Sequence, residues 1–359
     1  MGHAHRWLLV AGVALCGLAA SGQVEDPEPL EIVPEYTAVI ATNGGLWPRI
    51  HRREGELFVF AFASPSHTTA PGDVGCWVSG DQGKTWTQRA IAIPRPAPDA
   101  NYCDGCSGLT ANGDLLVMSG GWADAANQAE RRQMIPPAIY RSSDGGHTWA
   151  PGGYIPPVLA AGLVPRPYGK IVQAADGTLR TAVYGCGLKG PSVHDAWLLV
   201  SDDNGASWRP SALIAERINE GDLLELGLGE WLFVGREMGD PDSGQRLFRS
   251  LDDGQTWTDE GQITGDRQKP GDLIHLSDGR ILLTWGHRGR HEVWAKASAD
   301  GGHTWGRPWK VFATNPGDMG YPATIELADG LLLTAFYAAN SPLHEGYHAG
   351  LVAWRPPAP

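Results

Sequence analysis

The chain has 359 residues, 42% of them hydrophobic and only 19% charged, so it can bury a large core and does not have the composition of a disordered protein. Its formal net charge of -12, without any basic run, argues against a nucleic-acid-binding surface, because such binding depends on clustered Lys and Arg. The 48 Gly, 27 Pro and 15 Trp residues favour a turn-rich β protein over a helical one.

The N-terminus has the pattern of an export signal. Basic residues precede the apolar run WLLVAGVALCGLAA, and Ala20 and Gly22 supply the small residues expected before a cleavage site. The run is short for a membrane span, and no later segment reaches the ~20 apolar residues that a transmembrane helix needs. We predict a signal peptide over 1–22, a secreted or periplasmic location, and an acidic, Pro-rich lead-in over 23–34.

Four cysteines remain after the predicted cleavage, namely Cys76, Cys103, Cys106 and Cys186. The motif CDGC at 103–106 has redox or half-zinc-site spacing, but no second Cys pair accompanies it. In an exported chain, a structural disulfide or a plain loop is the better interpretation, and the pairing is open. The sequence therefore predicts neither a metal nor an organic cofactor.

Five octets with the pattern S-x-D-x-G-x-T/S-W recur at intervals of 48 to 63 residues. They are SGDQGKTW from Ser79, SSDGGHTW from Ser142, SDDNGASW from Ser201, SLDDGQTW from Ser250 and SADGGHTW from Ser298. In such a turn the Asp carboxylate accepts hydrogen bonds from backbone N–H groups, Gly adopts positive φ, and Trp packs beneath. Each octet is predicted to close the tip of an outer β-hairpin.

A second repeat alternates with the octets and consists of two apolar strands around a Gly-containing turn. Its six turn glycines are 50 to 64 residues apart, at Gly55, Gly113, Gly177, Gly229, Gly279 and Gly330. Asn-Gly and Asp-Gly between apolar runs are hairpin signals. Six units of about one four-stranded sheet each predict an all-β, six-bladed β-propeller over 35–356. The sixth unit lacks an octet, which a closing strand shared between the first and last blades would explain.

The octets resemble Asp boxes, also called bacterial neuraminidase repeats, and their spread over the mature chain resembles the sialidase superfamily. Asp boxes lie at hairpin tips on the outside of a propeller and also occur in proteins that are not enzymes, so they indicate fold and not activity. The resemblance implies a site where the inner strands begin, at one end of the propeller axis. The family's site has three arginines for the substrate carboxylate, a Tyr nucleophile paired with a Glu, and an Asp acid/base.

The resemblance carries over to single positions in the order that the family has along the chain. Arg49 in LWPRIHR corresponds to the first arginine, although His51 stands where the family has proline. Glu220 and Arg236 in NEGDLLELGLGEWLFVGRE correspond to the Glu ahead of a strand and the Arg at its end. The alternative explanation for this second pair is an internal salt bridge without function.

The third arginine and the nucleophile follow in the last two repeats. Arg290 in WGHRGRHEVWAKAS is the predicted third arginine, with Arg288 as a close competitor, and Tyr321 in MGYPATIELADG is the predicted nucleophile. The arginines would hold the sugar carboxylate, since a planar guanidinium binds carboxylate through two parallel hydrogen bonds. A neutral Tyr hydroxyl approaches an anomeric carbon next to that carboxylate where an anionic nucleophile would be repelled, and Glu220 would take the phenolic proton.

The acid/base is the position at which this sequence departs from the family. The family's Asp lies in a loop of the first blade after an F-A-x-x-R-like strand end, whereas FVFAFASPSHTTAPGDVGCWVS has no Arg and offers only Asp73. Asp104 in YCDGC and His67 are the second and third candidates. Either the loop is reshaped or the catalytic acid is absent.

Other charged or aromatic residues stand where further inner strands are expected to begin. They are Arg166, Tyr168 and Lys170 in RPYGKIV, and Arg267 and Lys269 in RQKPGDLI. These side chains would line a pocket for an acidic sugar, or they would be solvated loop charges, which is the commoner case.

The resemblance implies a secreted, retaining exo-alpha-sialidase, a glycoside hydrolase that removes terminal sialic acids from glycoconjugates without a cofactor. A noncatalytic sialidase-like propeller that binds acidic glycans or a protein partner is one alternative. A propeller hydrolase for another acidic sugar is the other. The first-blade loop discriminates hydrolysis from binding, because loss of the acid/base leaves binding intact and reduces hydrolysis.

Overall fold

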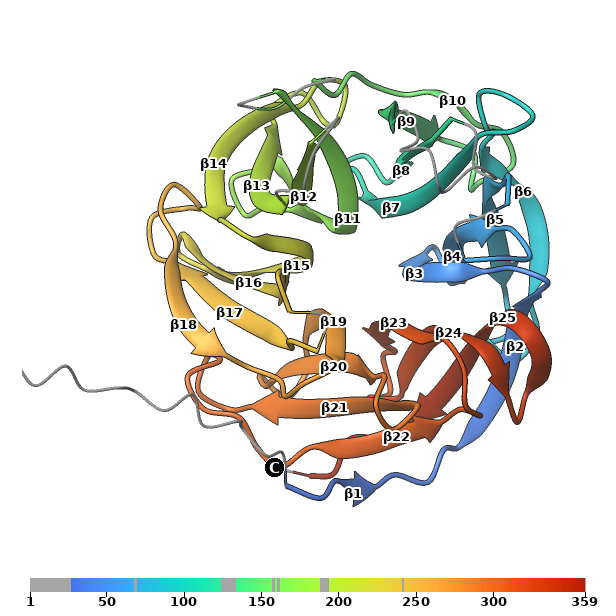
Figure 1. The fold of residues 1–359 in the computed structure, drawn as a ribbon, viewed down its shortest axis with the longest axis vertical. Coiled ribbons are helices and arrows are strands. Elements are labelled where there is room, and N and C mark those ends of the chain that lie inside the picture. The colour runs from blue at the N-terminus through green and yellow to red at the C-terminus, as the bar shows by residue number, and fades with distance from the viewer. Residues whose placement is uncertain are drawn as a thin grey trace, which may run out of the picture.

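The computed structural model describes residues 27–67, 70–123, 134–156, 159, 162–187, 194–240 and 242–358. The predicted signal peptide lies outside these ranges. No α-helix occurs in the described ranges, and the strands form five sheets arranged radially around a central axis (Figure 1). The chain is thus an all-β, propeller-like protein, as its sequence predicts. In the part of the chain that the structure describes, no helix is long and apolar enough to cross a membrane.

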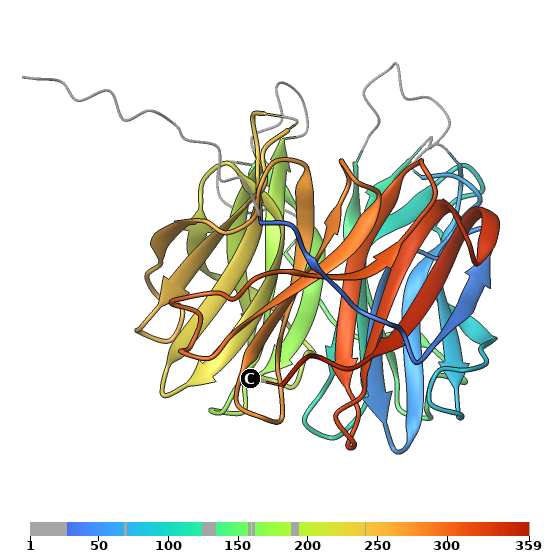
Figure 2. The same cartoon turned by 90° about the horizontal axis from the view of Figure 1, so that it is seen from below.

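Three of the sheets have four strands each. One consists of β3 (Leu46–Arg53), β4 (Glu56–Ala63), β5 (Asp73–Ser79) and β6 (Thr87–Ile93). Another consists of β15 (Ile218–Gly227), β16 (Glu230–Glu237), β17 (Gln245–Ser250) and β18 (Thr258–Gln262). The third has the order β2 (Tyr36–Thr42), β25 (His344–Trp354), β24 (Leu332–Ser341) and β23 (Met319–Glu326). Figure 2 shows the sheets from the side, with their strands running between the two faces of the molecule.

The other two sheets have five and eight strands. The five-stranded sheet has the order β1 (Leu30–Glu31), β22 (Trp309–Ala313), β21 (Glu292–Ser298), β20 (Ile281–His287) and β19 (Gln268–His275). The first half of the eight-stranded sheet is β10 (Ala150–Pro151), β9 (Met134–Ser142), β8 (Leu115–Trp122) and β7 (Asn101–Leu109). The second half is β11 (Leu163–Gln173), β12 (Leu179–Gly187), β13 (His194–Ser201) and β14 (Arg209–Ala215). The halves meet where β7 and β11 pair in parallel through only two residue pairs.

The two ends of the chain meet in one sheet. Strand β2, close to the N-terminus, pairs antiparallel with β25, close to the C-terminus, and forms the outer edge of the sheet that β23 begins (Figure 1). This strand is the closing strand that the missing sixth octet predicts. Closure matters because it joins the last repeat to the first and leaves fewer sheet edges exposed.

Each octet closes the hairpin between the two outer strands of its repeat, as predicted. In the octet from Ser142, Gly146 N donates to Ser142 Oγ at 2.8 Å, and Thr148 N and Oγ1 both donate to the Asp144 carboxylate. Trp149 Nε1 donates to Gly146 O at 3.1 Å. The same set of bonds recurs in the other four octets. These turns are therefore held by contacts within eight residues.

The octets also join each repeat to the one before it, which the sequence pattern does not reveal. Arg180 on β12 donates from Nη1 to the backbone carbonyl of Asp253, the residue before the glycine of the octet at 250–257. In each of the other four octets, the corresponding carbonyl accepts a hydrogen bond from a side chain of the preceding repeat. The donor and acceptor residues are Tyr36 and Gln82, Arg89 and Gly145, Arg141 and Asn204, and Arg249 and Gly301. Each octet is thus a latch between neighbouring repeats.

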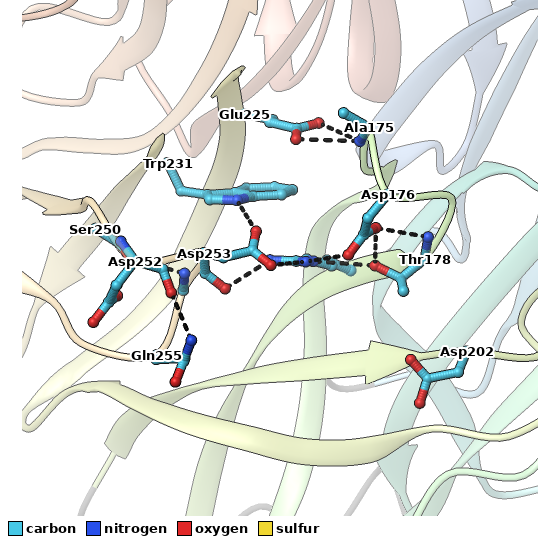
Figure 3. A network of polar contacts seen from close by, with 12 residues as sticks. Ala175, Asp176, Thr178, Asp202, Glu225, Trp231, Ser250, Asp252, Asp253 and Gln255 are labelled. Atoms are coloured by element: carbon cyan, nitrogen blue, oxygen red, sulfur yellow. Dashed lines mark hydrogen bonds and ion pairs between the residues drawn. The ribbon is translucent and has the colours of Figure 1, made fainter. Parts of the chain in front are cut away.

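At the Arg180 latch the guanidinium contacts two carboxylates and an aromatic ring in addition to the carbonyl. Its Nη2 also donates to Asp176 Oδ2 at 2.8 Å and to Asp253 Oδ2 at 2.7 Å. The guanidinium carbon lies 4.8 Å from the ring of Trp231, whose Nε1 donates to Asp253 Oδ1. Figure 3 shows Asp176, Asp253 and Trp231 converging on this point. Arg180 is only 3% exposed, whereas the side chains of Asp176 and Asp253 are 46% and 45% exposed, so its loss removes charge-assisted hydrogen bonds from a half-buried network.

We expect Arg180→Met to lower the free energy of unfolding by about 1–3 kcal/mol, since Met keeps much of the volume but removes every hydrogen bond. Arg209→Met is the matched control, because Arg209 and its partner Asp202 are both more than half exposed and such pairs contribute about 0–1 kcal/mol. Urea denaturation of both variants measures the difference. Equal losses in the two would contradict the latch.

Buried charges tie the inner strands around the axis. Lys170 on β11 reaches Asp222 Oδ2 of β15 at 2.5 Å and Asp272 Oδ1 of β19 at 3.0 Å. Each carboxylate also accepts a hydrogen bond from a backbone N–H of the next inner strand. Leu273 donates to Asp222, and Thr324 donates to Asp272. Asp222 and Asp272 are 0% and 1% exposed, so Lys170 is the counter-charge that makes their burial tolerable.

Asp272 gives this network a pH dependence. Burial, opposed by Lys170, raises the pKa of Asp272 from 3.8 to about 6. A raised pKa means that the folded state holds the proton more strongly, so the group's contribution to stability is present below about pH 4 and is lost as the pH rises towards 6. We expect the unfolding free energy of the wild type, minus that of Asp272→Asn, to fall over this pH window in urea denaturation. A constant difference would contradict this assignment.

Candidate active site

The strands nearest the axis share an irregularity. In each of them the register with the next strand shifts, near the start in five strands and in the middle of β11. These breaks include Trp47, Cys103, Tyr168, Glu220, Lys269 and Tyr321. A bulge bends a strand and redirects a side chain out of the alternating pattern. The repeated bulges therefore present one residue from every inner strand in a region where the sheets converge (Figure 1).

Three residues predicted from the sequence meet in this region. Tyr321 on β23 donates from its hydroxyl to Glu220 Oε1 at 2.7 Å. Arg236 on β16 donates from Nη1 to Glu220 Oε2, also at 2.7 Å. Tyr321 is 4% exposed and the side chain of Glu220 10%. One carboxylate thus bridges the phenol and the guanidinium.

The charges of this triad follow from its surroundings. Burial and the neighbouring Glu220 carboxylate raise the pKa of Tyr321 well above 10, so the phenol keeps its proton in the resting state. Burial alone would raise the pKa of Glu220, but Arg236 and the hydrogen bond from Tyr321 outweigh it and lower the pKa below 4.5. A neutral hydroxyl is therefore hydrogen-bonded to a charged base, which is how an activated nucleophile is arranged.

The turn between β20 and β21 sends its two arginines to different places. The guanidinium carbon of Arg288 lies 5.4 Å from the ring of Tyr321, and its Nη1 is 3.5 Å from Asp318 Oδ1. Arg290 instead pairs with Glu28 at 2.7 Å and stacks on Trp294. The structure therefore brings Arg288 to the triad and does not bring Arg290, the predicted third arginine, because Arg290 is engaged by the N-terminal lead-in.

Lys269 adds a third cationic residue to Arg236 and Arg288. It occupies the bulge of β19 and is 3% exposed. Burial, together with the charges of Arg236 and Arg288, lowers the pKa of Lys269 to about 8. This mutual influence places the three cations in one electrostatic environment around Glu220, which favours the binding of an anion.

Arg49 lies behind an aromatic ring. Its guanidinium carbon is 4.1 Å from the centroid of Tyr168, whose ring is 5.7 Å from that of Tyr321. Arg49 is 2% exposed, and none of its three guanidinium nitrogens has a hydrogen-bond partner in the described part of the protein. The bulge of β3 presents Trp47 beside Tyr321 instead, at 5.9 Å between rings. The predicted first arginine therefore contacts the site through Tyr168.

The three candidates for the acid/base lie in different places and have different contacts. Asp73, at the start of β5, accepts the backbone N–H of Arg95 at 2.7 Å and pairs with its guanidinium at 3.5 Å. The structure gives Asp73 no contact with the triad in the described ranges. Asp104 belongs to β7, and its side chain lies outside the described part of the structure. The Nδ1 atom of His67 lies 2.6 Å from Asp318 Oδ2, and that carboxylate also faces Arg288.

Asp318 is the site residue that sequence reasoning missed. It lies three residues before Tyr321, just ahead of β23, and accepts hydrogen bonds from Tyr337 at 2.9 Å and Tyr347 at 3.3 Å. Its position just ahead of an inner strand, close to Tyr321, is the signal that could have identified it.

Two of the cysteines pack against this region, and none of the four forms a disulfide. All four described cysteines are buried. Cys103 and Cys186 belong to the hydrophobic cluster that contains Trp47, Tyr168 and Tyr321. No disulfide therefore forms among them, and no cluster of three metal-ligating side chains occurs within the described ranges.

Comparison with known proteins assigns the chain to a family. The model of the BNR repeat-like domain family matches residues 55–333. No curated protein matches the sequence. A Dyadobacter fermentans protein of unknown function has a similar structure, with a TM-score of 0.77, 23% identity, and coverage of 90% of this chain and 99% of that one.

Two solved sialidases are also similar in structure. Hadza microbial sialidase Hz136 has a TM-score of 0.69 and 19% identity, with 87% of this chain and 66% of that chain covered. Trypanosoma rangeli sialidase has a TM-score of 0.67 and 15% identity, with 92% and 58% covered. The chain thus spans about two thirds or less of these two proteins, and at such identities the likeness shows the fold. The chain belongs to the BNR repeat-like domain family, and its fold is similar to that of the two sialidases.

Proposed function

We propose that the protein is an exported, retaining exo-alpha-sialidase-like glycoside hydrolase that removes a terminal acidic sugar, with sialic acid as the first candidate. The observation that carries this proposal is the contact of Tyr321 and Arg236 with the two oxygens of Glu220. A neutral phenol beside an ionised base suits attack on an anomeric carbon that bears a carboxylate. Arg236 and Arg288, with Lys269 nearby, would bind that carboxylate.

We also propose that the fold is a six-bladed propeller with five Asp boxes. Counting the halves of the eight-stranded sheet as two blades is supported by their junction, which has only two residue pairs. The shared hydrogen bonds of the octets support their assignment as Asp boxes.

A noncatalytic propeller that binds acidic glycans is the second candidate. The engagement of Asp73 by Arg95 favours it, because the group that the resemblance implies as the acid does not reach the triad. The same cationic surroundings of Glu220 would serve binding alone, since an anion site needs no proton donor.

Release of free sialic acid from a fluorogenic α-sialoside and from sialyllactose, over a range of pH, tests hydrolysis directly. Saturable release by the folded wild-type protein would support the proposal. No release, combined with retention of the protein on immobilised sialylated or uronic-acid glycans, would favour the binding propeller. Hydrolysis of a different acidic glycoside with no effect on sialosides would assign another sugar.

The two arginines of the β20–β21 turn should differ sharply in this assay. We expect Arg288→Ala to reduce kcat/KM by about 30-fold or more, because truncating a half-buried charge that pairs with the ligand costs roughly 2 kcal/mol or more. Arg290→Ala should stay within about twofold, since its partner is the exposed Glu28. The reverse order would return the third-arginine role to Arg290.

A further inference from the structure

The retaining reaction proposed above needs a group that protonates the leaving oxygen and later takes a proton from water. The segment between β4 and β5 is where the family resemblance places that group. In this protein the Asp that follows that segment, Asp73 at the start of β5, is bound to Arg95. The titratable side chain that this segment directs towards the residues of the site is His67.

A carboxylate holds one nitrogen of the His67 ring. The Nδ1 atom is 2.6 Å from Asp318 Oδ2, and the side chains are 33% and 23% exposed, so the pair is half-buried. An acceptor at Nδ1 fixes the orientation of the ring. The other nitrogen, Nε2, is then the one available to exchange a proton with a bound molecule.

Asp318 is itself held from three further sides. Tyr337 and Tyr347 donate to its Oδ2 at 2.9 Å and 3.3 Å, and Arg288 faces its Oδ1. Burial would raise the pKa of Asp318, but His67 and Arg288 outweigh it and keep the pKa below 3.8. The carboxylate therefore remains ionised and keeps its place as the acceptor for His67.

The imidazole ring lies beside the same two aromatic rings as the nucleophile. Trp47 is 4.9 Å from the ring of His67 and 5.9 Å from that of Tyr321. Tyr337 is 6.0 Å from His67 and 5.6 Å from Tyr321. His67 and Tyr321 thus share two aromatic neighbours, which places both side chains in one part of the site.

We propose that His67, positioned by Asp318, is the general acid/base of this site in place of the aspartate that the family resemblance implies. This inference rests on the proposed glycoside hydrolase function. Asp318 is a positioning residue in this scheme, since it acts through His67.

The protons balance over the two half-reactions. In the first, the His67 imidazolium gives its Nε2 proton to the glycosidic oxygen as that carbon–oxygen bond breaks. The bond from Tyr321 Oη to the anomeric carbon forms, and the phenolic proton passes to Glu220. In the second, water attacks the anomeric carbon, neutral His67 takes a proton from it, and Tyr321 leaves and recovers its proton from Glu220. One water is consumed for each bond cleaved.

Leaving-group dependence distinguishes a proton donor from a structural residue. Wild type and His67→Ala would be compared on sialyllactose, whose sugar alkoxide leaves only when protonated, and on a 4-nitrophenyl sialoside, whose phenolate leaves without a proton. We expect His67→Ala to lose about 10²–10⁴-fold in kcat/KM on sialyllactose and much less on the aryl substrate. Azide should raise the turnover of the aryl substrate by the variant, because an anionic nucleophile needs no general base.

Two further variants sharpen the test. Asp318→Asn should show a smaller loss with the same dependence on leaving group, since it removes the charge but leaves an acceptor for Nδ1. His147→Ala is the control, because His147 is exposed in an octet and uses only its backbone N–H there, and it should match wild type on both substrates. Circular dichroism and thermal unfolding establish that the variants fold.

The outcomes separate this inference from the function on which it rests. Equal losses of His67→Ala on both substrates, or full activity on sialyllactose, would exclude His67 as acid/base while the hydrolase function stands. Wild-type protein that cleaves neither substrate would overturn the hydrolase function and this inference together.

Discussion

Tyr321→Phe is expected to reduce sialoside hydrolysis by on the order of 10³-fold or more while the protein remains folded. The change removes one oxygen atom, the one that is hydrogen-bonded to Glu220 at 2.7 Å. Without it the site loses the hydroxyl that is hydrogen-bonded to Glu220, whereas the cations of Arg236 and Arg288 remain. The measurement is kcat/KM on a fluorogenic α-sialoside, with the unfolding midpoint recorded in parallel.

Tyr168→Phe is the matched control for this prediction. Tyr168 is equally buried and packs against Tyr321 at 5.7 Å, but its hydroxyl has no hydrogen-bond partner in the described part of the protein. Removing an unpaired hydroxyl should change kcat/KM by less than about threefold. If Tyr321→Phe kept more than about a tenth of the wild-type rate, the nucleophile would have to be another group.

Lys170→Met should lower the free energy of unfolding by about 3–5 kcal/mol, the largest stability effect that we expect from one substitution. The change leaves Asp222 and Asp272 buried without their counter-charge. It also loosens β11, β15 and β19 from one another, because Lys170 joins all three strands. Urea denaturation at neutral pH, with the m-value compared, measures the loss.

Lys310→Met controls for the removal of a lysine as such. Its nearer partner, Glu31, is 66% exposed, so a change of about 1 kcal/mol or less is expected. If Lys170→Met also lowered the free energy of unfolding by less than about 1 kcal/mol, water would have to replace Lys170 as the partner of the two carboxylates. Replacing Lys170 and Asp222 together should cost less than the sum of the single changes, because their contact couples them.

The triad was predicted from the sequence, but its partners were not all predicted. Tyr321, Glu220 and Arg236 were assigned through the resemblance to sialidases, whose matching positions fall at strand starts or ends, and the structure brings the three side chains into contact. Arg288 and Arg290 are two residues apart in one turn, and the choice between them depends on Glu28, which the N-terminal segment brings alongside. No local pattern contains that information.

The remaining site residues depend on packing between distant segments. The bulge of β3 sets Trp47 beside Tyr321 and leaves Arg49 behind Tyr168, and a shift in strand register is not visible in a list of residue types. Asp318 and His67 come from opposite ends of the chain and meet only when the last sheet closes against the first.

The octets mark the boundary between what the sequence and the tertiary structure decide. Their closed turns were predictable, because Ser, Asp, Gly, Thr and Trp satisfy one another within eight residues. The latches between repeats were not, because the acceptor is a backbone carbonyl, such as that of Asp253, which every residue possesses. The sequence thus determined the turns, the repeats and the triad. The tertiary structure decided which side chains from other repeats reach them, since those contacts depend on distances that only the closed ring of sheets defines.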